Sequence, residues 1–552
     1  MRALYINLIL CIFAFSCSSQ NNPEAESELY SYQELITADY LRDHLEVIAH
    51  DTLEGRGTGE AGLKKAADYL ADVHAELGLT PIGDDDSYFQ YFDLNSRVLE
   101  QVRFITSTLS NGDTQTTESI FQPGEAASYT LLSGGEQSFS GEVVFAGFGA
   151  VDAARNVDNF GSEDVAGKWV MVFQNIPHVV GGDTLIAPEY DERVRLNEIL
   201  GSRNAAGVII IPNMNEQEYM QASRAASYEL GSPISLSLDH MPTAQQFPGT
   251  YLSINPDYAA EQLGVGNGEL LSFQNELAND IQDFQAYQTS THLEINPEIN
   301  TEPIETQNVV SYFEGSDPDL KEEVVVLMAH YDHLGTGVPD ETGDRIFNGA
   351  DDNGSGTVTM LSIARSLTEA AQSGVRPRRS IVFLHVSAEE WGLLGSRYYS
   401  DNPIIPIDQT VANINMDMIG RRDQMHIEQD EEDFIYIIGA EIISSDMDSL
   451  LQEANQKSTD LTLNMRYNDL DDPNQFYRRS DHWNFGRLEV PFIFFFSGVH
   501  EDYHSQSDSV DDVLFGALEK RARLIYATTL EIANADEAPE VDSEEFIRRT
   551  RQ

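Results

Sequence analysis

The chain has 552 residues, which is too long for one ordinary domain and allows two or three, each with its own core. Acidic residues number 92 against 33 basic ones, so the formal net charge is -59, which disfavours binding to nucleic acid or to an anionic membrane surface. The charge also favours a halophilic or marine protein, with an acidic secreted protein that needs no salt as the alternative.

The first residues predict export. Residues 1–17 carry one Arg, an apolar run and then small polar residues, which indicates a secretory signal peptide rather than a membrane span. Cys17 follows a segment similar to the cleavage box of bacterial lipoproteins. We therefore expect lipid attachment at Cys17 and a cell-envelope lipoprotein, with simple secretion to the periplasm or the medium as the alternative. Residues 18–35 are predicted to form a polar tether.

Cysteine use limits the kind of metal site that the chain can build. It has 2 cysteines, and Cys11 would be removed with the signal peptide. The mature chain would then have no disulfide and no pair of thiolate ligands, although export permits disulfides. Any metal site must be built from His, Asp and Glu.

Two helices are predicted near the start of the mature chain. Residues 37–49 and residues 59–77 both carry apolar residues at helical spacing. Gly55, Gly57 and Gly59 predict a tight loop between these helices. We reject a phosphate-binding loop there, because no strand precedes it and no Gly-Lys-Ser/Thr sequence follows it.

Residues 97–290 have a different sequence pattern, which predicts short β-strands, glycine turns and few long helices. The segments VFAGFG, Asp164–Trp169 and GVIII resemble the protease-associated domain, a β-rich module inserted in several secreted proteases. An unrelated β-rich insertion is the alternative. Ligand-like spacings of His, Asp and Glu are missing from this region, so we expect it to carry no chemistry of its own.

After residue 305 the pattern becomes strand, loop and helix in repeated order. This order predicts an α/β fold with a mostly parallel or mixed sheet and helices on both faces. Four apolar runs each lead to a His or a carboxylate at or shortly after the strand end, and an Asp pair precedes a predicted helix; these residues are His330, Asp351-Asp352, Glu389-Glu390, Asp417 and Tyr503-His504. Since ligands bind beyond the carboxyl ends of such strands, the groups should converge on one rim.

That set of side chains suits a zinc site. Zinc is bound by His nitrogen and carboxylate oxygen, and two zinc ions about 3.5 to 4 Å apart need one shared carboxylate and further ligands on each side. The set of predicted ligands is His330, Asp352, Glu390, Asp417 and His504. Glu389 remains for acid/base work: a water bridging two cations would lose its proton near neutral pH, and Glu389 would take that proton and return it to the leaving amine.

Five motifs in order resemble those of the co-catalytic zinc exopeptidases of peptidase family M28, which include bacterial aminopeptidases, glutamate carboxypeptidase and glutaminyl cyclase. They are HYDHLG (330–335), NGADDNGSG (348–356), SAEEWGLLGS (387–396), NMDMIG (415–420) and DYH (502–504). The resemblance implies a catalytic domain formed by residues 36–96 and 291–535, interrupted by the insertion.

The resemblance also implies roles for single residues. His330 and Asp417 would bind one zinc ion, Glu390 and His504 the other, and Asp352 would bridge them. Glu389 would be the general base. Asp332 would orient His330 without binding metal. Tyr503 would donate a hydrogen bond to the tetrahedral oxyanion, and the peptide bond after Asp352 is expected to be cis.

Other residues could replace members of this set. Asp351 could be the bridge in place of Asp352. His482 or His500 could replace His504. His333 could be a ligand, but we favour a loop residue that packs below the site, and His385 lies within a strand and is expected to be an interior residue.

The chain keeps every ligand position for two metals, which favours hydrolysis over cyclisation. Only one helix, about residues 513–533, and an acidic tail, residues 536–552, follow the last motif, so no large helical dimerisation domain is expected. We therefore favour an aminopeptidase acting on peptides, with a carboxypeptidase or dipeptidase of the same family as the alternative. A hypothesis from another functional class is that the protein is a non-catalytic lipoprotein that binds a ligand at the cell surface.

Overall fold

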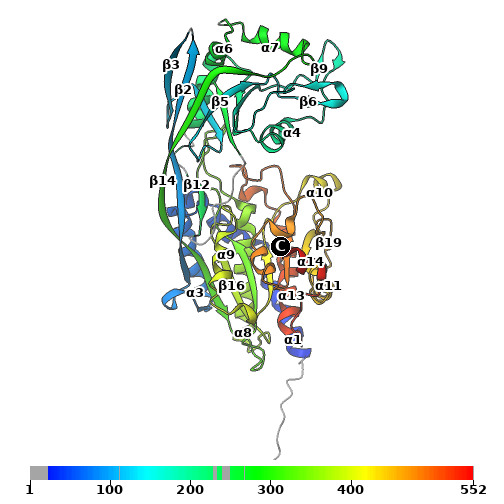
Figure 1. Cartoon of the computed structure of the whole chain (residues 1–552). Helices are drawn as coiled ribbons and strands as arrows, with labels where there is room; N and C mark the ends of the chain where they lie inside the picture. Colours follow the sequence, from blue (N-terminus) through cyan, green and yellow to red (C-terminus); the bar gives the residue numbers. More distant parts are fainter. Residues whose placement is uncertain are drawn as a thin grey trace, which may run out of the picture. The chain divides into compact units, whose positions relative to one another are not determined.

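The computed structural model of the chain describes residues 23–110, 112–227, 230, 233–238, 249–266 and 268–550. The predicted signal peptide and Cys17 lie outside these residues. The chain divides into two compact units, one formed by Met1–Asp93 and Glu305–Gln552 and the other by Leu94–Ile304 (Figure 1). The second unit is longer at both ends than the insertion predicted at 97–290, because strands β2 and β14 run through both boundaries without a break.

The first unit is built on a mixed sheet. Its spatial order is β19 (Thr462–Asn464), β18 (Phe434–Gly439), β20 (Phe492–Phe496), β17 (Thr410–Met416), β15 (Val324–His330), β16 (Ser380–Val386) and β14 (Tyr287–Phe313), with β1 (Thr80–Pro81) beside β14. Strands β20, β17, β15 and β16 are parallel. Strands β18 and β14 run antiparallel to their neighbours β20 and β16. The parallel strands therefore end at one edge, as the sequence predicts.

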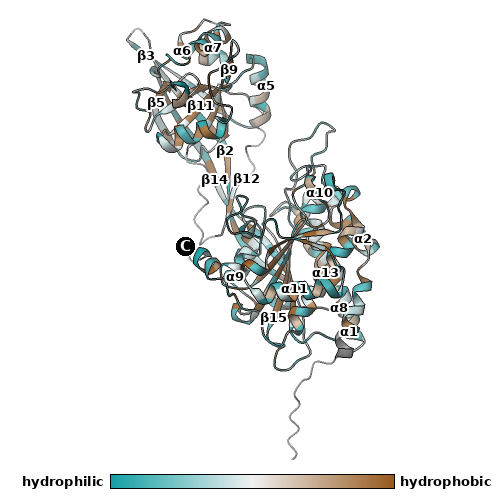
Figure 2. Cartoon of the chain, turned by 90° about the vertical axis from the view of Figure 1, so that its right-hand side faces the viewer, coloured by the Kyte–Doolittle hydropathy of each residue, from teal (hydrophilic) through white to brown (hydrophobic). Residues whose placement is uncertain are grey.

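Helices cover both faces of this sheet, which confirms the predicted fold class. Alternate residues of β15 point to opposite sides: Val325 and Leu327 belong to one apolar cluster, and Val326 and Met328 to another. The first face packs against α2 (Ala38–Ile48), α3 (Ala61–Glu76), α8 (Gly356–Gln372), α11 (Ser445–Lys457) and α13 (Phe515–Asn534); the second packs against α9 (Leu394–Asp401), α12 (Trp483–Gly486) and α14 (Glu544–Thr550). Figure 2 shows brown strands in the middle of this unit and teal residues on the outer faces of its helices. Because both faces are buried, the strands are continuously apolar.

Three predicted helices are confirmed with small shifts of their ends. Residues 37–49 and 59–77 contain α2 and α3, and the helix predicted at about 513–533 corresponds to α13 (Phe515–Asn534). The side chain of Thr37 accepts the backbone N–H of Tyr40 and so caps the start of α2.

The ends of the chain differ from prediction. Part of the predicted tether, residues 23–35, forms helix α1 (Pro23–Ser31) and a 3-10 turn, and the buried Leu29 packs in the main apolar cluster. The predicted acidic tail forms α14, whose Phe546 is fully buried against the second face. In both segments a few apolar residues among charged neighbours provide the contact, which is too weak a pattern to stand out in the sequence.

The second unit has a sheet of its own, continuous with the first through β14. Its strands are β2 (Phe89–Ser110), β3 (Asp113–Phe121), β4 (Tyr129–Ser133), β5 (Phe139–Phe145), β8 (Trp169–Phe173), β11 (Gly207–Ile211), β12 (Pro233–Ser237) and β13 (Thr250–Ile254), with the short hairpins β6/β7 (Val151–Asp152, Val157–Asp158) and β9/β10 (Val179–Val180, Asp183–Thr184). Its helices are α4 (Glu192–Leu196), α5 (Glu216–Ala226), α6 (Pro256–Leu263) and α7 (Leu270–Asn279). The predicted buried strands correspond to β5, β8 and β11, and the latter two are buried at every position.

In the part of the chain that the structure describes, none of the helices combines the length and the apolar character needed to cross a membrane.

Candidate metal centre

The predicted ligands gather at the edge of the first unit where the parallel strands end. His330 is the last residue of β15, Asp417 follows β17 directly, and Glu390 lies in the turn after β16. Asp352 comes from the turn Ala350–Ser355 that leads into α8, and His504 from the loop after β20. The peptide bond between Asp352 and Asn353 is cis, as the family resemblance implies.

Asp352 lies between the two imidazoles. Its Oδ1 lies 3.3 Å from Nε2 of His330, and its Oδ2 lies 3.2 Å from Nε2 of His504. On the outer sides, Asp417 Oδ1 is 3.3 Å from Nε2 of His330, and Glu390 Oε2 is 3.1 Å from Nε2 of His504. Each imidazole nitrogen therefore faces one oxygen of the shared carboxylate and one of an outer carboxylate.

Two overlapping groups of side chains at the site, which include Glu389 and leave out His504, have the spacing of metal ligands. The donor atoms of His330, Glu389 and Asp417 lie within 4.8 Å of one another, as do those of His330, Asp352 and Glu390. Imidazole nitrogen and carboxylate oxygen are the donors that zinc prefers. The residues present therefore fit the metal that the sequence predicts.

Crowding of buried carboxylates dominates the electrostatics of the site. Burial raises the pKa of Glu389 well above its usual value, and the carboxylates of Glu390 and Asp417 raise it further. Burial lowers the pKa of the His504 imidazole, but its bonds to Asp352 and Glu390 more than offset this and raise that pKa to about 10. The raised pKa of His504 expresses an excess of negative charge around it, and the same excess would attract cations.

Asp332 has a different contact from the one predicted. The closest acceptor to Nδ1 of His330 is the backbone oxygen of Asp332 at 3.2 Å, while Oδ1 of Asp332 is 3.7 Å away, beyond a hydrogen bond. The carboxylate of Asp332 instead accepts the backbone N–H of Glu389 at 3.1 Å and the hydroxyl of Thr58 at 3.1 Å. Asp332 thus holds the turn that carries Glu389, and its backbone orients His330.

Further supporting residues were not predicted from the sequence. Ser480 donates a hydrogen bond of 2.6 Å to Oδ2 of Asp417. His333 is buried, and its Nδ1 lies 2.8 Å from Oε1 of Glu390, so it contacts a predicted ligand rather than only packing below the site. Such contacts fix the orientation of metal ligands. Two features of the sequence could have indicated these residues. Ser480 precedes Asp481 and His482, and His333 lies within the motif HYDHLG.

The glycine-rich loop near residue 57 contacts the backbone of the segments that carry the candidate ligands. The buried guanidinium of Arg56 donates to the backbone oxygens of Tyr331, Asn348 and Gly349 at 2.6 to 3.0 Å. Gly55 has a positive φ of 69°, and a Cβ there would lie 2.2 Å from the backbone oxygen of Gly335. The predicted tight loop therefore joins the segments that carry His330 and Asp352.

The alternative residues lie in other places. Asp351 is buried and accepts the backbone N–H of Gly420 at 2.6 Å, and its other oxygen lies 3.5 Å from Nε2 of His500. The ring of His482 packs against Phe492 and Phe494, with centroids 4.6 Å apart in both cases. None of these side chains is in the two groups of candidate ligands found among the described residues.

A cavity of about 50 Å³ opens onto the candidate ligands. Its lining carries the carboxylates of the site, Ser480 and Tyr503, whose ring stacks on that of His504 at 3.8 Å. The remaining lining residues are mostly apolar: Met418, Phe476, Phe494, Phe496 and Val499, with Arg479 as the one guanidinium. The cavity therefore places an apolar wall and one cation beside the acidic cluster.

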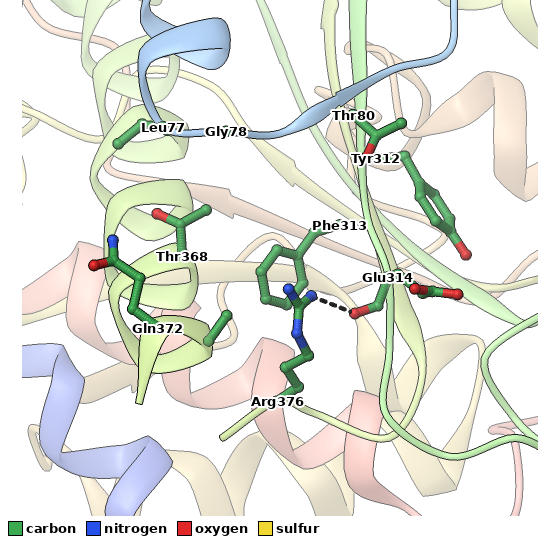
Figure 3. A pocket seen from close by; sticks show the side chains of 10 residues that line it. Leu77, Gly78, Thr80, Tyr312, Phe313, Glu314, Thr368, Gln372 and Arg376 are labelled. Carbon is green, nitrogen blue, oxygen red and sulfur yellow. Dashed lines mark hydrogen bonds between the residues drawn. The ribbon is translucent and has the colours of Figure 1, made fainter. Parts of the chain in front are cut away.

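A larger cavity, of about 300 Å³, lies at the other edge of the same sheet. Tyr312 and Phe313, in its lining, pair with the first residues of β16, whereas the candidate ligands follow the ends of the strands. Figure 3 shows Arg376 over the ring of Phe313, donating to the backbone oxygen of Glu314 at 2.8 Å. Its lining contains no imidazole among the described residues, so it has no metal-ligand set of this kind.

Comparison with known proteins bears on this geometry. Residues 308–529 match the model of peptidase family M28, and this segment contains every predicted ligand. The segment 308–529 therefore belongs to peptidase family M28. Similar proteins include a probable zinc metalloprotease of Leptosphaeria maculans, 34% identical over 118 residues, or 21% of this chain and 25% of that protein. Leucine aminopeptidase 2 of Arthroderma otae is 25% identical over 254 residues, or 42% of this chain and 45% of that protein.

One solved structure supports the fold over nearly the whole chain. An aminopeptidase from Aneurinibacillus sp. strain AM-1 aligns with a TM-score of 0.51 and 15% identity, covering 94% of this chain and 96% of that one. By contrast, the chain spans less than half the length of the two curated relatives described above. The family is therefore shown for residues 308–529 and the fold for nearly the whole chain, and the activity of the whole protein is argued separately.

Proposed function

We propose that the protein is a metallo-aminopeptidase that holds two zinc ions and removes residues from the amino terminus of peptides. The observation that carries the proposal is the position of Asp352, whose two oxygens face His330 and His504 at 3.3 and 3.2 Å. A carboxylate between two imidazoles, each with an outer carboxylate, is the ligand pattern that two neighbouring cations need. His330 and Asp417 would hold one zinc ion and Glu390 and His504 the other, with Asp352 shared.

Charge supports a pair of divalent cations. Asp352, Glu389, Glu390 and Asp417 line one small cavity, and buried carboxylates without counter-charges are strongly unfavourable. Two divalent cations would balance the charge of these groups. When bound, zinc would act as a Lewis acid and lower the pKa of a water held there.

Glu389 is the residue that we propose as general base. It lines the cavity, and its backbone is held by Asp332. Burial, together with neighbouring carboxylates, raises its pKa, so the group binds a proton more readily than an ordinary glutamate. It would take a proton from water during attack on the peptide carbonyl and deliver it to the leaving amine.

Tyr503 is proposed to stabilise the tetrahedral oxyanion. It lines the same cavity, and burial raises its pKa, with the carboxylate of Asp352 adding to the shift. The phenol would therefore stay protonated and could donate a hydrogen bond to a developing negative charge.

Preference for the amino terminus is supported by similar proteins, which include a leucine aminopeptidase and a bacterial aminopeptidase. The apolar wall of the cavity agrees with an apolar group in the part of the substrate that packs against it. We further propose that the protein is exported, carries a lipid on Cys17 and works in saline surroundings. We also propose that the inserted region contains a protease-associated domain.

Mass spectrometry of a peptide pair tests the proposed function. One peptide has a free amino terminus and the other is acetylated, and both are incubated with the protein and zinc in molar salt, with and without a chelator. We expect amino-terminal residues to be lost from the free peptide alone and the loss to stop with the chelator. Loss of carboxy-terminal residues from both peptides would replace this assignment with a carboxypeptidase.

A further inference from the structure

Arg479 places a cation in the lining of the catalytic cavity, beside a site built of carboxylates. Among the described residues, no carboxylate forms an ion pair with its guanidinium, whose carbon lies over the ring of Phe476, 5.0 Å from the ring centroid. The side chain is exposed, whereas Ser480, the next residue, is buried and bonded to Asp417. Arg479 therefore stands at the border between the acidic cluster and solvent.

The backbone of Arg479 and the aromatic ring beside its guanidinium are held by other residues. Its backbone N–H donates to the oxygen of Phe476 at 3.2 Å. The ring of Phe476 is buried and packs against Tyr467 and Phe496, with centroids 4.8 and 5.1 Å apart. A guanidinium over a fixed aromatic ring loses little further freedom when it binds an anion.

The cation is not needed to neutralise the site if the site holds metal. Two divalent cations would balance the carboxylates of the cavity, which leaves Arg479 to meet an anion that arrives with the substrate. A guanidinium presents its N–H donors in a plane and binds a carboxylate through two parallel hydrogen bonds.

We infer that Arg479 recognises a carboxylate of the substrate peptide, so that the protein prefers peptides with a negative charge close to the bond that is cleaved. The carboxylate has two sources: an acidic side chain or the free carboxy terminus of a short peptide. This inference rests on the proposed aminopeptidase function and adds a substrate class to it.

Matched dipeptides separate the two sources. Glu-Leu-amide against Gln-Leu-amide and Leu-Glu-amide against Leu-Gln-amide report on side chains, and Leu-Leu against Leu-Leu-amide reports on the carboxy terminus. For each pair, kcat/KM is measured with the wild-type protein, with R479Q and R479K, and with R478Q. Arg478 is the matched control, because it is the neighbouring arginine, contacts Gln475 and Tyr477, and is not in the cavity lining.

We expect at least one charged peptide to be cleaved with a kcat/KM about tenfold above its neutral partner, since a hydrogen bond to a charged group discriminates by roughly that factor or more. R479Q should abolish this ratio, R479K should keep part of it, and R478Q should keep all of it. Equal rates for all pairs in the wild-type protein, or a ratio that R478Q lowers as much as R479Q does, would overturn the role of Arg479. Absence of cleavage of every dipeptide, the neutral ones included, would overturn the proposed function itself and this inference with it.

Discussion

The carboxylate of Asp508 accepts the backbone N–H of Asp352 at 3.0 Å. It also accepts the backbone N–H of Asp351, at 3.0 and 3.1 Å. Asp508 is fully buried, and burial and the charge of Asp351 raise its pKa to about 7. A segment more than 150 residues away in sequence thus holds the turn that presents the shared carboxylate to both imidazoles.

Replacing Asp508 by Ala should weaken the site. The substitution leaves two buried N–H groups without an acceptor and frees the turn, so we expect the zinc dissociation constant to rise about 10- to 100-fold and kcat/KM to fall with it. Metal titration and peptide kinetics measure both quantities. The matched control is Asp511→Ala, at an exposed carboxylate in the same segment, which should behave as wild type. Wild-type zinc affinity in Asp508→Ala would show that the turn holds its shape without this contact.

The carboxy-terminal helix α14 should contribute to the stability of the first unit. Phe546 is fully buried among Phe492 and other aromatic residues, so Phe546→Ala should lower the free energy of unfolding by about 3 to 5 kcal/mol. Urea unfolding measures the change. Arg548→Ala, at an exposed position of the same helix, should change it by less than about 0.5 kcal/mol. Equal effects of the two variants would mean that α14 does not pack as described.

The residues that sequence reasoning placed well share one property: each follows an apolar strand within a few positions. His330, Glu390 and Asp417 stand at strand ends, where the residue type and the periodicity together indicate a site. Asp352 precedes a predicted helix and His504 follows an apolar run, and the order of the motifs agrees with both placements.

The supporting residues could not be found in this way, because their partners are distant in sequence. Arg56 lies in a glycine loop and bonds to segments almost 300 residues further along the chain, and Asp508 stands in a polar run that looks like a solvated surface. Asp332 was expected to contact His330 through its carboxylate, but only the geometry shows that the backbone oxygen is closer. Hydrogen-bond direction is a property of the folded backbone and leaves no pattern in the residue order.

A buried histidine pair should make stability depend on pH. Nε2 of His74 lies 3.3 Å from Nε2 of His385, and both rings are fully buried. Burial lowers the pKa of His74 to about 3 and that of His385 well below its usual value. Both are neutral in either state above the unfolded pKa of about 6.5. Below it the unfolded chain binds protons that the folded chain does not, so stability falls as the pH drops from about 6.5 towards 3.

Unfolding in urea between pH 8 and pH 4.5 measures this effect. In wild type, each histidine should add up to about 1.4 kcal/mol per pH unit to the slope of the unfolding free energy against pH below pH 6.5. The double variant His74→Leu/His385→Leu should lack this contribution, and its slope should match wild type above pH 7. Equal slopes for both proteins in the acid range would show that the pair takes up protons without unfolding.

The central claim is that Glu389 moves protons while the other groups hold two zinc ions. Zinc content and kcat/KM of Glu389→Gln, measured on the same preparation with a peptide that has a free amino terminus, test it most directly. We predict two zinc ions per chain, as in the wild-type protein, with kcat/KM lowered about 100- to 10,000-fold, since the amide cannot accept the proton. Loss of one zinc ion would make Glu389 a ligand, and unchanged kcat/KM would contradict its role as the base.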